Sequence, residues 1–102
     1  MPVRGLPMTN TEIAAVFDDI AARLTLKKDN IFKVRAYQKV ARAISELAIP
    51  VTQLVAENRI KEIPGAGEAI TKKITELVTT GKLEYYEKLK AESPAGVRSA
   101  GA

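Results

Sequence analysis

The chain has 102 residues, of which 46% are hydrophobic, and it contains no cysteine and no histidine. This composition excludes disulfides, thiol nucleophiles, Cys/His zinc sites and Ser-His-Asp triads. A length of this order indicates one small domain, and the chain lacks the apolar run of roughly 18 residues that a transmembrane helix requires. We therefore expect a cytoplasmic protein that does not associate with membranes.

The formal net charge is +4, and the positive excess is concentrated in residues 27–42. That segment carries six basic residues and a single acidic one, whereas the rest of the chain carries ten basic and eleven acidic residues. A concentrated basic segment is typical of a surface that binds phosphate groups. The alternative interpretation is a solvated helix face with scattered lysines, and charge alone does not separate the two.

The first predicted helix follows residues 1–8, which contain two prolines and a glycine and which we interpret as a flexible leader. Thr9 and Glu12 form a capping-box pattern, so a helix is expected from residue 10. Apolar residues then recur at spacings of three and four, as on one face of an amphipathic helix. These residues are Ile13, Val16, Phe17, Ile20, Ala21 and Leu24.

A second helix is expected to begin near Ile31 or Phe32 and to end at Pro50, because a residue before proline disfavours helical geometry. Its apolar positions are Val34, Tyr37, Ala41, Ile44 and Leu47. Residues 51–57 predict a short third helix. The sequence Pro64-Gly65-Ala66-Gly67 is a strong turn signal.

A fourth helix follows this turn, with an apolar stripe at Ile70, Ile74, Leu77 and Val78, and with Gly81 as its C-terminal glycine. Residues 82–90 can form a last short helix around Leu83, Tyr86 and Leu89. Residues 91–102 are small, polar and rich in glycine, which predicts a disordered tail or linker. No alternating strand pattern occurs, so the predicted fold class is all-α.

The segment IKEIPGAGEAITKK, residues 60–73, carries the chemistry of the chain. Glycines at 65 and 67 permit backbone angles and close approaches that other residues resist. We expect the amides of both glycines and of the next helical turn to point outward without partners and to attract an anion such as a DNA phosphate. Lys61, Lys72 and Lys73 flank this turn. The alternative is an ordinary tight turn between two helices.

The sequence IPGAGEAITKKI resembles the helix-hairpin-helix of the family X DNA polymerases, the group of DNA polymerase beta, and particularly its bacterial branch. NIFKVRAYQKVARAI (30–44) and TTGKLEYYEKLK (79–90) are similar to the family's second helix and to its segment after the hairpin. The resemblance covers residues 9–90. It implies the small amino-terminal domain of these enzymes, a four-helix domain of paired helix-hairpin-helix units that a short fifth helix can follow.

The resemblance also implies a role in DNA repair, in which the domain binds gapped, nicked or single-stranded DNA through its phosphates without base specificity. We expect a monomer within a longer polymerase chain, associated with the nucleoid if the source is bacterial. The residues assigned to DNA are Lys33, Arg35, Lys39, Lys61, Gly65, Ala66, Gly67, Lys72 and Lys82. No cofactor is required, but the family hairpin holds Na⁺ or K⁺ through backbone carbonyls, here those of Lys61, Ile63 and Ala66.

Several eukaryotic members of this family remove a 5′-deoxyribose phosphate through a Schiff base on a lysine, and the resemblance assigns that lysine to Lys73 and a tyrosine near the sugar to Tyr37. Only an uncharged amine attacks an aldehyde, so such a lysine needs shielding. On a helical wheel, Lys73 borders the apolar stripe whereas Lys72 points to solvent. The alternative is a lysine whose stem covers the edge of the core.

The chain departs from the vertebrate pattern where Ala69 replaces a phosphate-binding lysine and Tyr85 replaces another basic residue, which weakens the expected 5′-phosphate pocket. Phe32 replaces a histidine that stacks on the template, and Lys72 replaces an acidic residue.

Three functions therefore stay open. The first is a DNA-anchoring domain of a family X polymerase, the second is an active 5′-deoxyribose-phosphate lyase, and the third is a helical protein-interaction module without a role on DNA. A polymerase site within this chain is excluded because its two metals need clustered carboxylates. Asp18-Asp19 is the only acidic doublet, and adjacent helical residues do not face each other.

Overall fold

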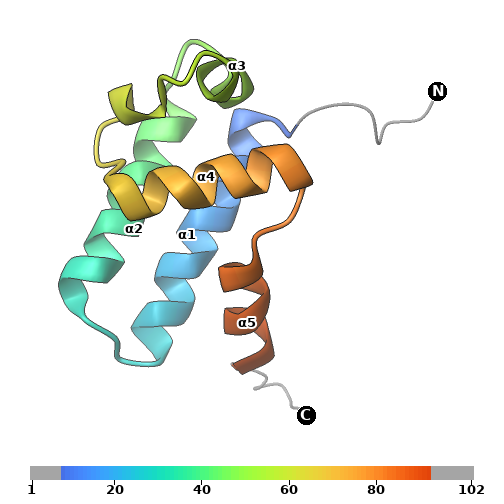
Figure 1. The fold of residues 1–102 in the computed structure, drawn as a ribbon. Coiled ribbons are helices and arrows are strands. Elements are labelled where there is room, and N and C mark those ends of the chain that lie inside the picture. The colour runs from blue at the N-terminus through green and yellow to red at the C-terminus, as the bar shows by residue number, and fades with distance from the viewer. Residues whose placement is uncertain (1–7, 93–102) are drawn as a thin grey trace.

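The computed structural model describes residues 8–92, which fold into helices only (Figure 1). The elements are α1 (Asn10–Leu26), α2 (Ile31–Ser45), α3 (Val51–Ala56), the short 3₁₀ helix η2 (Ile60–Glu62), α4 (Glu68–Thr80) and α5 (Glu84–Glu92). Residues 8–92 contain no strand, so the all-α prediction is confirmed. The interpretations of residues 1–7 as a leader and of 93–102 as a tail fall outside the described residues.

The helix ends follow local hydrogen bonding. The capping box predicted for α1 is confirmed, because the Thr9 hydroxyl accepts from the Glu12 amide at 3.1 Å and the Glu12 carboxylate accepts from the Thr9 amide at 2.9 Å. Gly81 ends α4 in the left-handed conformation, with φ of 79°, as predicted.

Two predicted boundaries are shifted. Helix α2 ends at Ser45 rather than at Pro50, because the Leu47 amide donates to the Ile44 carbonyl, three residues back, at 3.2 Å and so leaves the α-helical pattern. Helix α5 runs from Glu84 to Glu92 rather than over 82–90, because the Glu76 carboxylate accepts from the Glu84 amide at 2.9 Å and marks the helix start there.

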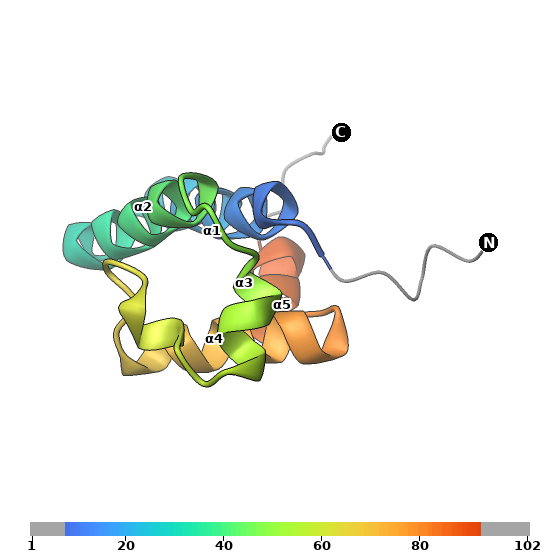
Figure 2. The ribbon, with the colours of Figure 1, turned by 90° about the horizontal axis from the view of Figure 1, so that it is seen from above.

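The helices form two layers. Helices α1 and α2 lie antiparallel and make one layer, and α4 crosses this pair in the other layer together with α3 and η2 (Figures 1 and 2). Helix α5 packs beside α1. The arrangement places the turn between η2 and α4 next to α2, which matters for the candidate site.

One apolar core joins the layers, and no polar side chain within residues 8–92 is buried in it. The predicted stripes of α1 and α4 supply much of this core, and burying each large apolar side chain contributes about 1.5–3 kcal/mol. The largest fully buried side chains are Phe17, Ile13, Ile20, Leu24, Ile44, Leu54, Ile63, Ile74, Leu83, Val40 and Val51. Met8, the last residue of the expected leader, packs half-buried against the core.

No helix of the described part has both the length and the apolar character needed to cross a membrane.

Candidate nucleic-acid interface

The turn between η2 and α4 is anchored by two buried residues and presents its glycines outward. Ile63 and Ala66 are 1% and 9% exposed, whereas Gly65 and Gly67 are exposed. Gly65 has φ of +88°, a conformation that L side chains rarely adopt. A Cβ atom at this position would also lie 3.2 Å from Cγ of Lys39. Gly65 therefore requires glycine for two reasons, and Lys39 of α2 lies directly against the turn.

Gly67 differs from Gly65, and the expectation that both glycines need unusual backbone freedom is wrong for it. Its φ of −72° and ψ of −177° are extended values open to other residues. A Cβ atom there would meet nothing within 4 Å. Its amide is not free either, because it donates to the Gly65 carbonyl at 3.1 Å. The missing side chain of Gly67 therefore leaves open space on the outside of the turn.

Helix α4 begins without a capping side chain, because Gly67 occupies the N-cap position. Within residues 8–92, nothing accepts a hydrogen bond from the amides of Gly65, Glu68 or Ala69. These amides supply free donors at the positive end of the α4 dipole. The open start of α4, meaning Gly65, Gly67, Glu68 and Ala69, is thus suited to an anion.

The other four α-helices have a side-chain acceptor at their start. Thr9 caps α1, and Asn30 caps α2 by accepting from the Phe32 amide at 2.7 Å. Helix α3 is capped across the fold, since the Asn10 amide oxygen accepts from the Val51 amide at 2.8 Å. The Glu76 carboxylate serves α5 in the same way. Among the α-helices of the described chain, α4 alone begins open.

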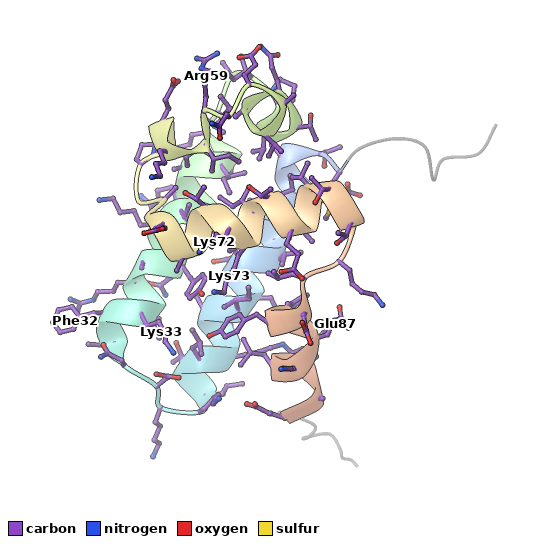
Figure 3. The ribbon with its side chains drawn as sticks, viewed as in Figure 1. Phe32, Lys33, Arg59, Lys72, Lys73 and Glu87 are labelled. Atoms are coloured by element: carbon purple, nitrogen blue, oxygen red, sulfur yellow. The ribbon has the colours of Figure 1, made fainter. Side chains whose placement is uncertain are left out.

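Cations surround the open start of α4. Lys39 contacts Gly65, Lys61 is exposed on η2 before the turn, and Lys72 is exposed one turn into α4. Figure 3 shows Lys72 and Lys73 at the edge of α4, with Lys33 on α2 below them in this view. Lys33 forms an ion pair with Asp29 at 3.5 Å. These cations, together with the free amides, give this side of the molecule a phosphate-binding character.

Two further predicted DNA residues lie apart from the turn. Arg35 is exposed on α2. Lys82 follows the C-terminal end of α4, about 20 Å from its start at 1.5 Å per residue. The structure therefore does not bring Lys82 to the open start.

Lys73 is half-buried and Lys72 is exposed, in agreement with the helical wheel. The Lys73 Nζ lies 4.7 Å from the ring centroid of Tyr85. Tyr85 in turn stacks on Tyr37, and Tyr37 stacks on Phe17, with centroids 6.1 Å apart in both pairs. Burial, followed by the effect of Tyr85, raises the pKa of the Tyr37 hydroxyl well above its usual range. The three rings form a column from the core to Lys73.

A pocket opens beside Lys73, lined by Glu68, Ala69, Lys72, Lys73, Glu76, Glu84, Tyr85 and Lys88. Its three carboxylates offset its three amines, so the pocket carries little net charge. Tyr37 is 5% exposed and does not line this pocket, whereas Tyr85 does. Tyr85 is thus the aromatic residue next to Lys73. The sequence carries one signal for it, since Tyr85 stands where the family resemblance implies a basic residue.

The carbonyls predicted to hold a monovalent cation are partly engaged. The Ile63 carbonyl accepts from the Ala66 amide at 3.0 Å, and the Ala66 carbonyl accepts from the Thr71 hydroxyl at 3.4 Å. A carbonyl oxygen has two lone pairs, so each keeps one for a ligand. Residues 8–92 hold no group of acidic, Cys or His side chains that would bind a metal ion. Carbonyl oxygens are the donor type that a hard cation prefers.

Comparison with known proteins agrees with this geometry. Residues 8–83 match the model of the helix-hairpin-helix domain family. Over 90 residues the chain is 29% identical to the DNA polymerase/3′-5′ exonuclease PolX of Bacillus subtilis (strain 168). That alignment covers 88% of this chain but 15% of the relative, so the chain spans only a small part of that protein's length. The resemblance noted in the sequence is confirmed.

Proposed function

Because the chain belongs to the helix-hairpin-helix domain family, we propose that it binds DNA through backbone phosphates and anchors gapped or nicked DNA for a family X polymerase in repair. Similarity to PolX supports a polymerase-like context. The observation that carries the proposal is the open start of α4, which lies beside Gly65 and Lys39.

A phosphate oxygen at this turn accepts from the free amides of α4, and the helix dipole favours its negative charge. Lys39 and Lys61 add positive charge on the α2 side of the turn, and the open space at Gly67 admits the ligand. None of these contacts reads a base edge, so we expect no sequence preference. Phosphate binding of this kind weakens steeply with salt, because it releases counterions.

The test is fluorescence anisotropy on a gapped duplex with a 5′ phosphate, an intact duplex and a single strand, each over a salt series. Gly67→Ala should lower stability only slightly, by about 0.5 kcal/mol, because alanine is a poorer N-cap than glycine although its methyl group meets no atom. It should weaken DNA binding clearly, because that methyl group blocks the phosphate. Gly65→Ala should lower both stability and binding. Gly81→Ala is the matched control, because it strains the backbone at φ of +79° at the far end of α4 and should lower stability alone.

Two results would count against the proposal. Unchanged affinity in Gly67→Ala would show that no phosphate approaches the turn. Absence of salt-sensitive binding in the wild-type chain would remove the DNA role and favour the protein-interaction module.

A second candidate function, the lyase, draws support from the half-buried Lys73 beside its pocket. The Lys73 amine would attack the aldehyde carbon C1′ of the abasic sugar, and loss of water would give a Schiff base. Loss of a C2′ proton to solvent would then break the C3′–O bond and release the 3′-linked DNA phosphate, with that oxygen, as the leaving group, and water would hydrolyse the imine to free Lys73. A ring face such as that of Tyr85 binds the ammonium ion rather than the neutral amine, so this contact favours anchoring over attack. Borohydride trapping on a 5′-deoxyribose-phosphate substrate decides between them.

In that assay, Lys73→Ala should abolish the trapped adduct and exposed Lys72→Ala should retain it. An adduct that persists in Lys73→Ala would show that another amine is the nucleophile.

The hairpin cation belongs to the same proposal. The carbonyls of Lys61, Ile63 and Ala66 would hold Na⁺ or K⁺ next to the bound phosphate and offset its charge. Replacing K⁺ with tetramethylammonium at constant ionic strength should weaken DNA binding, since the larger ion does not fit between carbonyl oxygens. Equal affinity in the two salts would exclude the cation.

A further inference from the structure

Helix α2 is unusual in its charge, because it carries four basic residues and no acidic one. Cations on a helix surface commonly pair with a carboxylate three or four residues away, and α2 offers none. Lys33 pairs with Asp29 before the helix. Arg35, Lys39 and Arg42 form no ion pair with any residue of the described chain. We call these three residues the α2 basic stripe.

Cations elsewhere in the described chain are commonly neutralised. Arg59 pairs with Glu57 at 2.5 Å and with Glu62 at 2.9 Å. Lys27 pairs with Glu92 at 2.7 Å, and Lys90 pairs with Glu87 at 3.2 Å. Five lysines elsewhere in residues 8–92 also form no ion pair, namely Lys28, Lys61, Lys72, Lys73 and Lys82. The distinguishing feature of α2 is therefore three unpaired cations on one helix face.

The α2 basic stripe lies on one face of the helix, because its members are four and three residues apart. All three line a shallow groove along α1 and α2, together with the neutral hydrogen-bonding side chains of Thr11, Gln38 and Ser45. Asp18 and Glu46 also line the groove, but neither pairs with the stripe. From Arg35 to Arg42 the helix rises about 10 Å, which is long enough to reach more than one phosphate of a strand.

Lys39 connects this groove to the open start of α4. Its side-chain carbons lie 3.2–3.6 Å from the position that a Cβ atom of Gly65 would take. Figure 2 shows the turn before α4 reaching toward α2. A phosphate held at the turn is therefore next to the middle of the stripe, with Arg35 and Arg42 one helical turn to either side.

We propose that the α2 basic stripe is a second contact surface for the DNA strand held at the hairpin, so that the strand runs along α2 and passes the turn at Lys39. The proposal rests on the proposed DNA binding and extends it to Arg42. An acidic peptide is a poorer fit, because the stripe is continuous through Lys39 with a phosphate site, whereas Asp18 and Glu46 repel both kinds of ligand alike.

The test compares three double variants in salt-titrated binding to a gapped duplex. Arg35→Gln/Arg42→Gln should lower the slope of log affinity against log salt by about 1.8, at about 0.9 per lost phosphate contact. Arg35→Lys/Arg42→Lys should retain the wild-type slope. Arg59→Gln/Lys90→Gln is the control, because it removes the same charge from residues outside both surfaces and should also retain the slope.

Four outcomes have distinct meanings. Loss of slope only in Arg35→Gln/Arg42→Gln supports the second surface. An unchanged slope in that variant, alongside weakened binding in Gly67→Ala, would overturn this inference but keep the proposed function. If the variant keeps its DNA slope but loses affinity for a polyglutamate peptide, the groove is a peptide site and the inference is wrong. Absence of DNA binding by the wild-type chain would overturn both.

Discussion

The first amides of α2 and α4 differ in whether a side chain accepts their hydrogen bonds. At α2, the Asn30 side chain accepts from the Phe32 amide, and Asp29 accepts from the Asn30 amide at 2.6 Å. At α4, Gly67 has no side chain to offer, and the first amides keep their donors free. Glycine in place of a good capping residue typically costs a few tenths of a kcal/mol of stability. The difference teaches that α4 gives up stability at the position where a phosphate would supply the missing acceptor.

Among the helices whose first amides have a side-chain acceptor, the largest loss of stability should come from Asn10→Ala. Asn10 donates to the Ile49 carbonyl at 2.9 Å and accepts from the Val51 amide, so it closes α3 from across the fold. Losing both bonds at a partly buried site should lower the free energy of unfolding by about 2 kcal/mol. Urea unfolding measures this change. Asn10→Asp keeps the acceptor and should lose less, whereas equal losses would assign the effect to the Ile49 contact alone.

Acid should loosen α5 and leave the other capped helices in place, because a carboxylate contact holds α5 to the fold. Asp19 accepts from the Tyr86 hydroxyl at 2.5 Å. Burial acts to raise the pKa of Asp19, but hydrogen bonds from Tyr86 and Arg23 outweigh it and lower that pKa. A lowered pKa gives stability that is complete above the ordinary value near 4 and is lost as the pH falls through the folded value. Tyrosine circular dichroism should show α5 loosening below about pH 4.

Tyr86→Phe is the control for this titration, because it removes the bond and should reduce the acid transition. The same contact acts at high pH. Burial and the Asp19 bond raise the pKa of Tyr86 to about 12, so the stability it contributes is lost as the pH rises toward that value. A transition unchanged in Tyr86→Phe would assign it to another carboxylate.

A capping side chain at the N-terminus of α4 should make this helix start resemble that of α2. In Gly67→Ser, the extended backbone lets the hydroxyl accept from the amides of the first turn. Stability should rise by a few tenths of a kcal/mol, because glycine is only slightly poorer than serine at this position. DNA affinity should fall several-fold, because the donors are occupied. Thermal unfolding and anisotropy on one sample measure both, and a rise in affinity would contradict the phosphate site.

The smallest effect is expected at Glu68, an exposed carboxylate in the first turn of α4. The helix dipole stabilises the negative charge of Glu68, but the same charge repels a phosphate bound at that end. Glu68→Gln should therefore strengthen DNA binding about threefold at low salt, and the gain should vanish at high salt. Glu87→Gln on α5 (Figure 3) is the control and should not change affinity. A weaker complex in Glu68→Gln would place the phosphate elsewhere.

Much of the fold was predictable because local chemistry decides it. The capping box at Thr9 and Glu12, the apolar stripe of α1 and the glycine after α4 each act within a few residues, and all are confirmed. The contact of Asn10 with Ile49 was not predictable, since it joins residues 39 positions apart. Periodicity identifies the buried face of a helix but not the element that covers it.

The candidate site was predictable in its residue types but not in its arrangement. The two glycines look equivalent in Pro-Gly-x-Gly, yet only Gly65 has a positive φ and a lysine packed against it. Tyr85 contacts Lys73 because α5 folds back beside α4, and no spacing in the sequence encodes that approach. The absence of a cap at α4 was visible in Gly67, but its contrast with the tertiary caps of α3 and α5 required the fold.

The packing of Lys39 against Gly65 has a consequence for conformational entropy. A lysine that becomes fixed by a ligand loses up to about 2 kcal/mol of rotamer freedom. Lys39 is exposed, but its Cγ and Cδ lie 3.2 and 3.3 Å from the position that a Gly65 Cβ atom would take, so the nearby turn excludes part of its rotamer freedom before any DNA binds. Part of the rotamer entropy of Lys39 is therefore lost on folding and not on DNA binding. Lys39 should bind a phosphate with a smaller entropic loss than Lys82, which is also exposed but lies beyond the end of α4 and away from this turn.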